Sequence, residues 1–283
     1  MIPFAIRNLK LYFRDRTAVF FSLLAVFIII GLYVLFLGET IVADMSEIKG
    51  ARFLMDSWVM AGLLAVTSVT TTMGAASVVV DDKSKGIAKD FHCSPLKRTA
   101  IVGGYLISTM VVGVIMSIVA LALAELYILA NGGELLPFLT MLKVLGLVLL
   151  SVMASGSIVF FIISFFKTQN AFAVASTMIG TLIGFLTGIY VPISVLPSPV
   201  QAVIKVFPIS HAAALFRQVF MEVPLTQSFM GAPLEVVTEF KINLGVLFQF
   251  GDYTMGAFGS ILILMLTVLL FFVLGVWRML SRS

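Results

Sequence analysis

The sequence is poor in charged residues, has a single cysteine and contains two histidines. Charged residues make up 11% of its 283 residues, whereas 60% are hydrophobic. A soluble globule of this length needs more polar side chains to cover its surface. The single cysteine, Cys93, excludes an internal disulfide, and no Cys/His spacing typical of a metal site occurs. The composition therefore indicates one integral membrane domain over residues 1–283, with no metal site.

Two patterns that would indicate an enzyme are also absent. The pattern G-x-x-x-x-G-K-[ST], whose backbone amides and lysine cradle ATP phosphates, does not occur. The pattern G-x-S-x-G is missing as well, and Ser155 and Ser157 have no His or Asp at a matching depth. His92 and His211 fall in connections expected on opposite faces of the membrane, so they cannot share a metal. We therefore expect no catalytic residue and no cofactor in this chain.

The sequence does contain long stretches without charged residues. Each is long enough for a helix to cross roughly 30 Å of hydrocarbon. Only a structure that satisfies its own backbone hydrogen bonds is stable there, which favours helices. The fold prediction is an all-α polytopic membrane protein whose six spans cover about 17–38, 57–80, 100–124, 144–166, 170–191 and 255–277.

The basic residues are unevenly divided between the two sides of these spans. Twelve of the eighteen fall on one side, namely Arg7, Lys10, Arg14, Arg16, Lys83, Lys85, Lys89, Lys97, Arg98, Lys167, Arg278 and Arg282. The positive-inside rule assigns that side to the cytoplasm. The net charge of +4 thus reflects topology rather than nucleic-acid binding. We expect a multi-pass protein of the plasma (cytoplasmic) membrane with both termini in the cytoplasm.

Residues 1–16 mix apolar and basic side chains before the first span. The apolar members are Phe4, Leu9, Leu11 and Phe13, interleaved with four basic residues. This pattern favours an amphipathic helix lying at the cytoplasmic headgroups. A solvated tail is the alternative.

The connection 81–99, on the cytoplasmic side, predicts a docking surface. Ile87 and Phe91 are apolar anchors at near-helical spacing among charges of both signs. Gly86 permits a sharp turn into a short helix, and Pro95 ends it. An ordinary polar hairpin loop is the alternative.

Two motifs carry a resemblance to a known family. Asp82, Lys83 and Gly86, then a short hydrophobic helix and Ser-Pro-x-x-Arg ending at Arg98, resemble the loop between spans two and three of ABC transporter type-2 permeases. The second motif resembles the family's signature after span five and consists here of Gly188, Pro192, Pro197, Pro208 and Arg217. The family often has Glu-x-x-x-Gly-Thr in the first motif, and this chain departs from it with Asp82 and Ile87.

The resemblance implies the membrane subunit of an ATP-driven exporter, with the drug and antibiotic exporters most similar. Two ATPase subunits would bind ATP and Mg²⁺, and a second permease copy, identical or similar, would complete the pathway. The scattered hydroxyls and aromatics of the apolar spans favour an amphipathic or lipid-like substrate, such as a drug or antibiotic, over a small ion. The coupling residues would be Asp82, Lys83, Gly86, Ile87, Phe91, Pro95 and Arg98. Residues 192–252 would form an extracellular segment with short re-entrant-like helices, in which Pro192, Pro197, Pro208 and Arg217 close the exit.

Small and hydroxyl residues inside the spans suggest further roles. Ser176, Gly180, Gly184 and Gly188 recur every four residues in the fifth span, which favours a close helix contact, with a gating hinge as the alternative. Thr67, Thr71 and Ser77 in the second span are candidates for lining a pathway, or else bond their own helix.

Ion-coupled carriers usually place an ionisable residue inside a span. The sequence predicts none deep in any span, with Glu125 near the outer end of the third as the closest case. A secondary transporter or channel without an ATPase is therefore the alternative function.

Overall fold

A computed structural model of the chain describes residues 1–38, 48–93 and 95–281. The prediction of an all-α polytopic fold is confirmed, because six helices in the described residues are long and apolar enough to cross a membrane. Parts of three predictions from the sequence lie outside the described residues: the first outer loop at 39–47, Ser94 of the first motif and Arg282 of the basic set.

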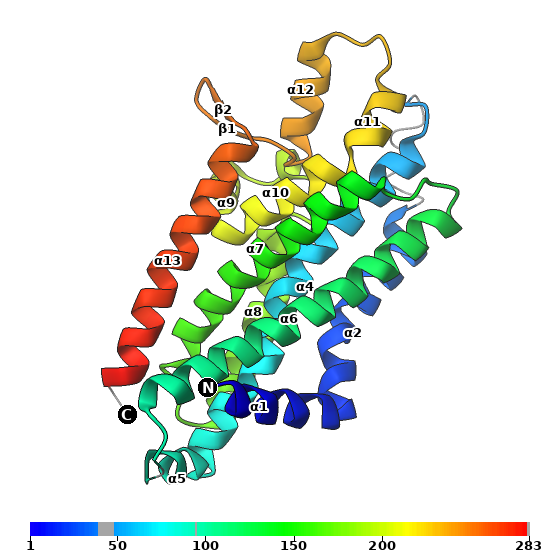
Figure 1. The fold of residues 1–283 in the computed structure, drawn as a ribbon. Helices are drawn as coiled ribbons and strands as arrows, with labels where there is room; N and C mark the ends of the chain where they lie inside the picture. The colour runs from blue at the N-terminus through cyan, green and yellow to red at the C-terminus, as the bar shows by residue number, and fades with distance from the viewer. Residues whose placement is uncertain (39–47, 94, 282–283) are drawn as a thin grey trace.

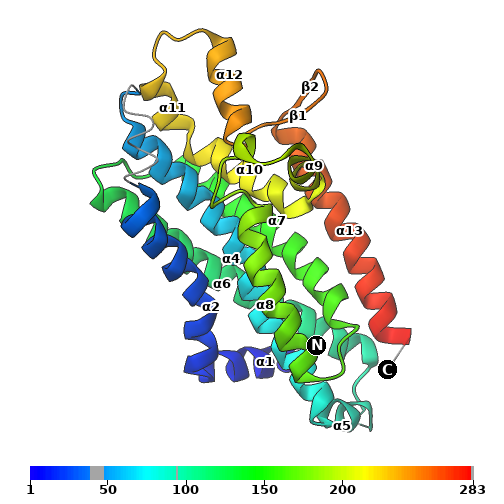
Figure 2. The same cartoon turned by 180° about the vertical axis from the view of Figure 1, so that it is seen from behind.

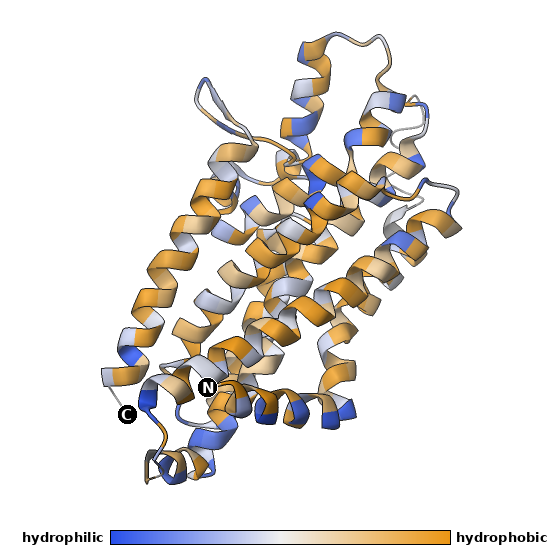
Figure 3. Cartoon of the chain, viewed as in Figure 1, coloured by the Kyte–Doolittle hydropathy of each residue, from blue (hydrophilic) through white to orange (hydrophobic). Residues whose placement is uncertain are grey.

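The six candidate spans form an elongated bundle (Figure 1). The first is α2 (Arg16–Leu32), which continues into a π-helical turn, η1 (Tyr33–Leu37). The others are α4 (Ala51–Ser84), α6 (Arg98–Ala130), α7 (Phe138–Ile163), α8 (Gln169–Leu186) and α13 (Ala257–Ser281). Hydrophobic residues cover the length of the bundle, and the hydrophilic ones gather toward its two ends (Figure 3).

Different elements close the two ends of the bundle. One end, here called the α5 end, carries α1 (Ile2–Arg14), α5 (Ile87–Cys93), the N-terminus and the last turn of α13 (Figure 1). The opposite end, the α12 end, carries α9 (Ser198–Val206), α10 (Pro208–Phe220), α11 (Glu222–Ser228) and α12 (Leu234–Asn243). A hairpin of β1 (Phe248–Phe250) and β2 (Tyr253–Met255), paired antiparallel, precedes α13.

The central helix is α4, which packs against α6, α7, α8 and α10 (Figures 1 and 2). Its large side chains, including Trp58, Leu63 and Leu64, are fully buried. Hydroxyls also cross this contact, because Ser68 Oγ lies 2.8 Å from Ser151 Oγ and 2.9 Å from Ser155 Oγ on α7. Small residues and shared hydroxyls hold membrane helices together where lipid provides no hydrophobic drive.

The helices extend beyond the charge-free windows of the sequence. Helix α4 begins at Ala51 and ends at Ser84, so Asp56 and Asp82 lie within it. Their charges do not break the helix, because Asp56 lies 3.7 Å from Arg52 Nε and Asp82 pairs with Arg7. Helix α8 ends early, at Leu186, because Gly188 adopts a φ of 63° that an α-helix does not accommodate.

The predicted short helices between spans five and six are confirmed. Pro192 and Pro197 precede a 3-10 turn, η2 (Ile193–Val195), and α9, while Pro208 occupies the first turn of α10. Helices α9 and α10 meet at a bend of 85°. The sequence did not predict α11, α12 or the β hairpin.

The helix predicted at the N-terminus is present as α1 and lies across the α5 end (Figure 1). Phe4, Asn8 and Tyr12 are buried against the protein, while Ile2, Ile6 and Leu11 are exposed. One face therefore packs on the bundle, and the other remains available to the bilayer surface.

Close packing of α4, α6 and α7 depends on Gly113, because a Cβ there would lie 2.7 Å from Thr72 Cγ2 and 2.8 Å from Val152 Cγ1. We expect Gly113→Ala to destabilise the protein by about 1–3 kcal/mol through overpacking. Gly146→Ala is the matched control, since a Cβ at this α7 position meets nothing within 4 Å. Thermal unfolding in detergent measures both variants, and equal midpoints would contradict this packing.

Candidate functional site

The α5 end presents a short helix on a tight turn. Helix α4 closes with an ion pair of 2.6 Å between Lys85 and Asp81, and Gly86 then turns the chain with a φ of 79°. This left-handed conformation favours glycine, and a Cβ at Gly86 would meet nothing within 4 Å. Helix α5 follows at once, with Lys89 and Asp90 exposed.

An ion pair joins α1 to the end of α4. Arg7 donates from Nη1 to Asp82 Oδ2 at 2.6 Å and from Nη2 to Oδ1 at 3.0 Å. Tyr105 on α6 donates to the same Oδ2 at 2.7 Å. The bond to Asp82 raises the pKa of Arg7 further above its usual range, so the guanidinium stays charged. One buried carboxylate thus holds three helices together.

Aromatic rings connect this ion pair to α5. The Phe4 ring lies edge-on to both Phe91 and Tyr105, with ring centroids 4.9 Å apart in each case. The Arg7 guanidinium carbon lies 5.0 Å from the Phe91 centroid, within cation–π range. We call Phe4, Arg7, Asp82, Phe91 and Tyr105 the junction. Through it, α5 contacts α1, and α1 in turn contacts α4 and α6.

The junction changes the roles expected of the predicted coupling residues. Asp82 is 3% exposed and bonded to Arg7 and Tyr105, so it lies inside the junction and not on the exposed surface of this end. Lys83 is also partly buried, with Nζ 3.2 Å from Met279 Sδ. Ile87 is half-buried on α5, whereas Pro95 and Arg98 are exposed at the surface of this end.

Sequence reasoning missed Phe4, Arg7 and Tyr105 as members of the junction. The available signal was the alternation in residues 1–16, which places Phe4 and Asn8 on one helical face with Arg7 beside them. Nothing in the sequence indicated which acidic residue Arg7 would meet.

At the α12 end, Arg217 is fully buried. Its Nη2 donates to the carbonyl of Gly188 at 2.9 Å, and its guanidinium carbon lies 4.6 Å from the Trp58 ring centroid. Within the described residues, Nε and Nη1 have no hydrogen-bond partner. Trp58 in turn donates to the Leu244 carbonyl at 2.8 Å. Arg217 therefore ties α10 to α4 and to the turn after α8.

The four small residues expected to form one packing face on α8 have different surroundings. Gly188 lies beyond the helix, and a Cβ at Gly184 would clash with the Tyr190 ring of the following turn. A Cβ at Gly180 would meet nothing within 4 Å, and Ser176 is half-buried. No helix of this chain's described residues approaches closely at Gly180, so the four positions do not form one contact face within the protomer.

Ser176 and Gly180 instead line a cavity of about 420 Å³ between α2, α4 and α8. These helices share one side of the bundle (Figure 2). The cavity lining combines aromatic and hydroxyl side chains, including Phe21, Phe172, Ser22, Thr70 and Ser77. Such a lining suits a molecule with apolar and polar parts.

The three hydroxyl residues predicted for a pathway separate into two groups. Thr67 and Thr71 are buried, and each donates to its own helix, to the carbonyls of Leu63 and Thr67, at 2.7 Å. These two bonds match the alternative, in which the hydroxyls bond their own helix, and neither residue lines the cavity between α2, α4 and α8. Ser77 lies in the cavity lining, and Thr70, which the sequence did not single out, lies there too.

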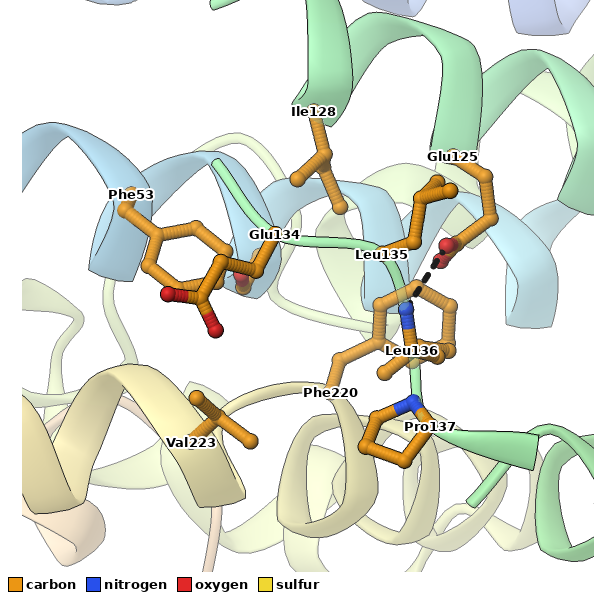
Figure 4. Close-up of a pocket in the computed structure, with 10 residues that line it drawn as sticks. Phe53, Glu125, Ile128, Glu134, Leu135, Leu136, Pro137, Phe220 and Val223 are labelled. Atoms are coloured by element: carbon orange, nitrogen blue, oxygen red, sulfur yellow. Dashed lines mark hydrogen bonds between the residues drawn. The ribbon is translucent and has the colours of Figure 1, made fainter. Parts of the chain in front are cut away.

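Two carboxylates near the α12 ends of their helices are buried within the protein. Asp56 on α4 is 1% exposed and Glu125 on α6 is 6% exposed. Oε2 of Glu125 accepts from a backbone amide of the loop before α7 at 3.1 Å (Figure 4). The charge-free windows missed Asp56 because the helix begins before it. His211 on α10 packs internally, with Nδ1 3.2 Å from Ser260 Oγ and Nε2 2.9 Å from the Lys205 carbonyl.

A family model described as ABC-2 family transporter protein matches residues 49–277. The chain belongs to the ABC-2 family of transporters. The resemblance in the sequence is thereby confirmed, and the chain is a membrane-spanning transport protein whose family implies the ATPase partner of an ABC transporter. A search of curated proteins finds no match. The matched range begins after α1, so Phe4 and Arg7 lie outside it.

In this ABC-2 protein, we expect Arg7→Gln to loosen α1 and α5 together, because Asp82 then keeps only Tyr105 as a partner. Leaving a buried carboxylate short of a partner costs about 1–3 kcal/mol. Hydrogen–deuterium exchange of the α1 and α5 amides measures the effect. Lys10→Gln, an exposed position on the same helix, is the control; matching exchange in the two variants would show that the junction does not hold these helices.

Proposed function

We propose that this chain is the permease subunit of an ABC exporter whose ATPase subunits bind ATP and Mg²⁺ and dock at the α5 end. The family assignment supports the ATPase partner. The basic residues near α1 and α5 support a cytoplasmic location for that end, by the positive-inside rule. The exposed Lys89, Asp90, Pro95 and Arg98 offer the docking surface.

The junction supports a mechanical role for α5. Because Phe91 packs on Phe4 and Arg7, a displacement of α5 is transmitted to α1 and, through Asp82 and Tyr105, to α4 and α6. Helix α4 reaches the opposite end, where Trp58 contacts Arg217. ATP-driven movement of the ATPases would thus bias the permease between inward-open and outward-open arrangements.

A second permease copy would pack on the side formed by α2 and α8. Helix α8 is the least hydrophobic of the candidate spans, and Ala173, Thr177 and Thr181 are exposed on it. The exposed side chains of α13 are large and apolar, such as Leu266 and Leu269, which suits lipid. Small and hydroxyl residues are typical of contacts between membrane helices.

The cavity between α2, α4 and α8 would then open toward the contact between the two permease copies and form half of the pathway. Its aromatic and hydroxyl lining supports an amphipathic substrate such as a drug, antibiotic or lipid-like molecule. At the α12 end, the α9–α10 bend and the Arg217–Gly188 bond would close the exit between cycles.

Loss of the Phe91 ring should uncouple ATP hydrolysis from export. We expect Phe91→Ala, in a complex with the partner ATPase, to lower ATP-driven export about five- to hundredfold. This is the range of factors to which typical coupling free energies correspond. The complex should still assemble, because the exposed docking residues are unchanged. Export into inverted membrane vesicles and co-purification measure the two properties.

Phe138→Ala is the matched control for this substitution, since Phe138 is exposed at the opposite end of the bundle. Normal export by an assembled Phe91→Ala complex would contradict the coupling role. If no ATPase partner co-purifies with the unmodified chain, the secondary-transporter or channel alternative is favoured instead.

The proposed contact between two permease copies through α2 and α8 can be tested with single cysteines introduced into a Cys93→Ser variant. We expect Thr177→Cys or Thr181→Cys on α8 to give cross-linked dimers in native membranes, because these positions would face the second copy. Leu266→Cys and Leu269→Cys on α13 should stay monomeric. Dimers formed through α13 and not through α8 would contradict the proposed contact.

A further inference from the structure

A groove runs along α1 between the long side chains of that helix. Its volume is about 320 Å³, and every residue that lines it belongs to α1. Three of these residues are basic and follow one side of the helix, at spacings of three and four residues: Arg7, Lys10 and Arg14. The other three are apolar: Pro3, Ile6 and Leu11. The lining of this groove, here called the α1 groove, therefore combines positive charge with apolar surface.

Two of the three positive charges have no ion pair within the described residues. Arg7 is bonded to Asp82, and its side chain remains 32% exposed. Lys10 and Arg14 are exposed, and neither occurs among the ion pairs of the described residues. None of the residues that line the groove is acidic. The α1 groove is therefore a hollow with uncompensated positive charge, which is complementary to an anion.

The position of α1 favours a lipid headgroup as that anion. Helix α1 ends at Arg14 and the first candidate span, α2, begins at Arg16, so the chain enters the bilayer directly after the groove. Ile6 and Leu11 are 45% and 42% exposed, which suits the apolar part of a lipid better than a soluble anion. Lysine and arginine bind phosphate through charge-assisted hydrogen bonds. A zwitterionic lipid would bring its own cationic group to the site, so an anionic headgroup is favoured.

We propose that the α1 groove binds the headgroup of an anionic phospholipid in the bilayer leaflet next to the α5 end. Lys10 and Arg14 hold the phosphate, while Arg7 stays on Asp82 and adds positive potential. Ile6 and Leu11 contact the apolar part of the lipid. The site uses residues of this chain alone and does not require an ATPase partner.

Occupancy of the α1 groove is linked to the junction, because Arg7 belongs to both. A lipid that holds α1 in place also holds Phe4 and Arg7 against Phe91 on α5. A ligand stabilises the arrangement that binds it, so anionic lipid should protect the amides of both α1 and α5. Helix α5 has no residue in the groove, and its protection would report the link. Nonspecific attraction to a charged surface would instead depend on total charge and not on Lys10 and Arg14.

The test uses the purified chain alone in detergent micelles, so its outcome is independent of the exporter proposal. Phosphatidylglycerol, or phosphatidylcholine with the same acyl chains, is added at constant ionic strength while thermal unfolding and hydrogen–deuterium exchange are followed. We expect phosphatidylglycerol to raise the unfolding midpoint saturably and to slow exchange in α1 and α5, with a much smaller effect of phosphatidylcholine. Glycerol 3-phosphate, which presents a phosphate without acyl chains, should have no effect at the same concentration.

Replacing both free cations of the groove should weaken the response. We expect Lys10→Gln with Arg14→Gln to lower the apparent affinity for phosphatidylglycerol about 25-fold, since each basic residue near an anionic lipid surface contributes about fivefold. Lys97→Gln with Lys167→Gln removes the same charge from exposed positions outside the groove and should respond like the parent. Lys10→Arg with Arg14→Lys keeps both charges and should retain most of the response.

Equal responses to the two lipids overturn the proposal, and so does a response to phosphatidylglycerol that both glutamine double variants retain equally. A response to glycerol 3-phosphate as large as that to phosphatidylglycerol would assign the groove to a soluble anion and exclude lipid as its occupant. An unchanged lipid response in Lys10→Gln with Arg14→Gln, together with loss of ATPase co-purification, would assign the groove to the partner subunit instead.

Discussion

Inside a bilayer, a polar group that loses water must find its partner within the protein, and the arrangement of this chain follows from how its polar groups meet that requirement. Asp82 is satisfied by Arg7 and Tyr105, and this solution fixes α1 across the ends of α4 and α6. Ser68 shares its hydroxyl with two serines of α7. Each such contact replaces water and also positions a helix.

The junction and the polar residues near Arg217 differ in how completely this requirement is met. At the α5 end, the junction is fully partnered and combines charge, a phenol hydroxyl and edge-on rings, as a rigid connection requires. At the α12 end, Arg217, Glu125 and Ser57 each keep an atom without a partner in the described residues. Incomplete satisfaction is expected where an element must exchange partners or accept a ligand. This contrast supports our proposal that the α5 end transmits movement of the ATPases as a rigid unit while the α12 end opens and closes.

Much of the fold could be predicted from the sequence because the spans are set by the solvent. Runs without charge indicated all six helices, and Pro192, Pro197 and Pro208 indicated the short helices after α8. Helix ends were less predictable: Asp56 and Asp82 continue α4 because ion-pair partners stabilise them, and the partner of Asp82 comes from a distant segment. The site was predictable only where local conformation decides it, as at Gly86. The Arg7–Asp82 pair joins residues far apart in sequence, and no local pattern contains that information.

In the proposed mechanism, α5 moves when the ATPases bind ATP, and the permease pair moves with it. Cys93 is the single cysteine of the sequence and is exposed at the end of α5, so the unmodified protein accepts one spin label per copy. Pulsed dipolar spectroscopy on the complex with its ATPase, before and after trapping with ATP and vanadate, measures the distance between the two labels. We predict one defined distance that shifts on trapping. Absence of dipolar coupling, or a distance unchanged by ATP, would contradict it.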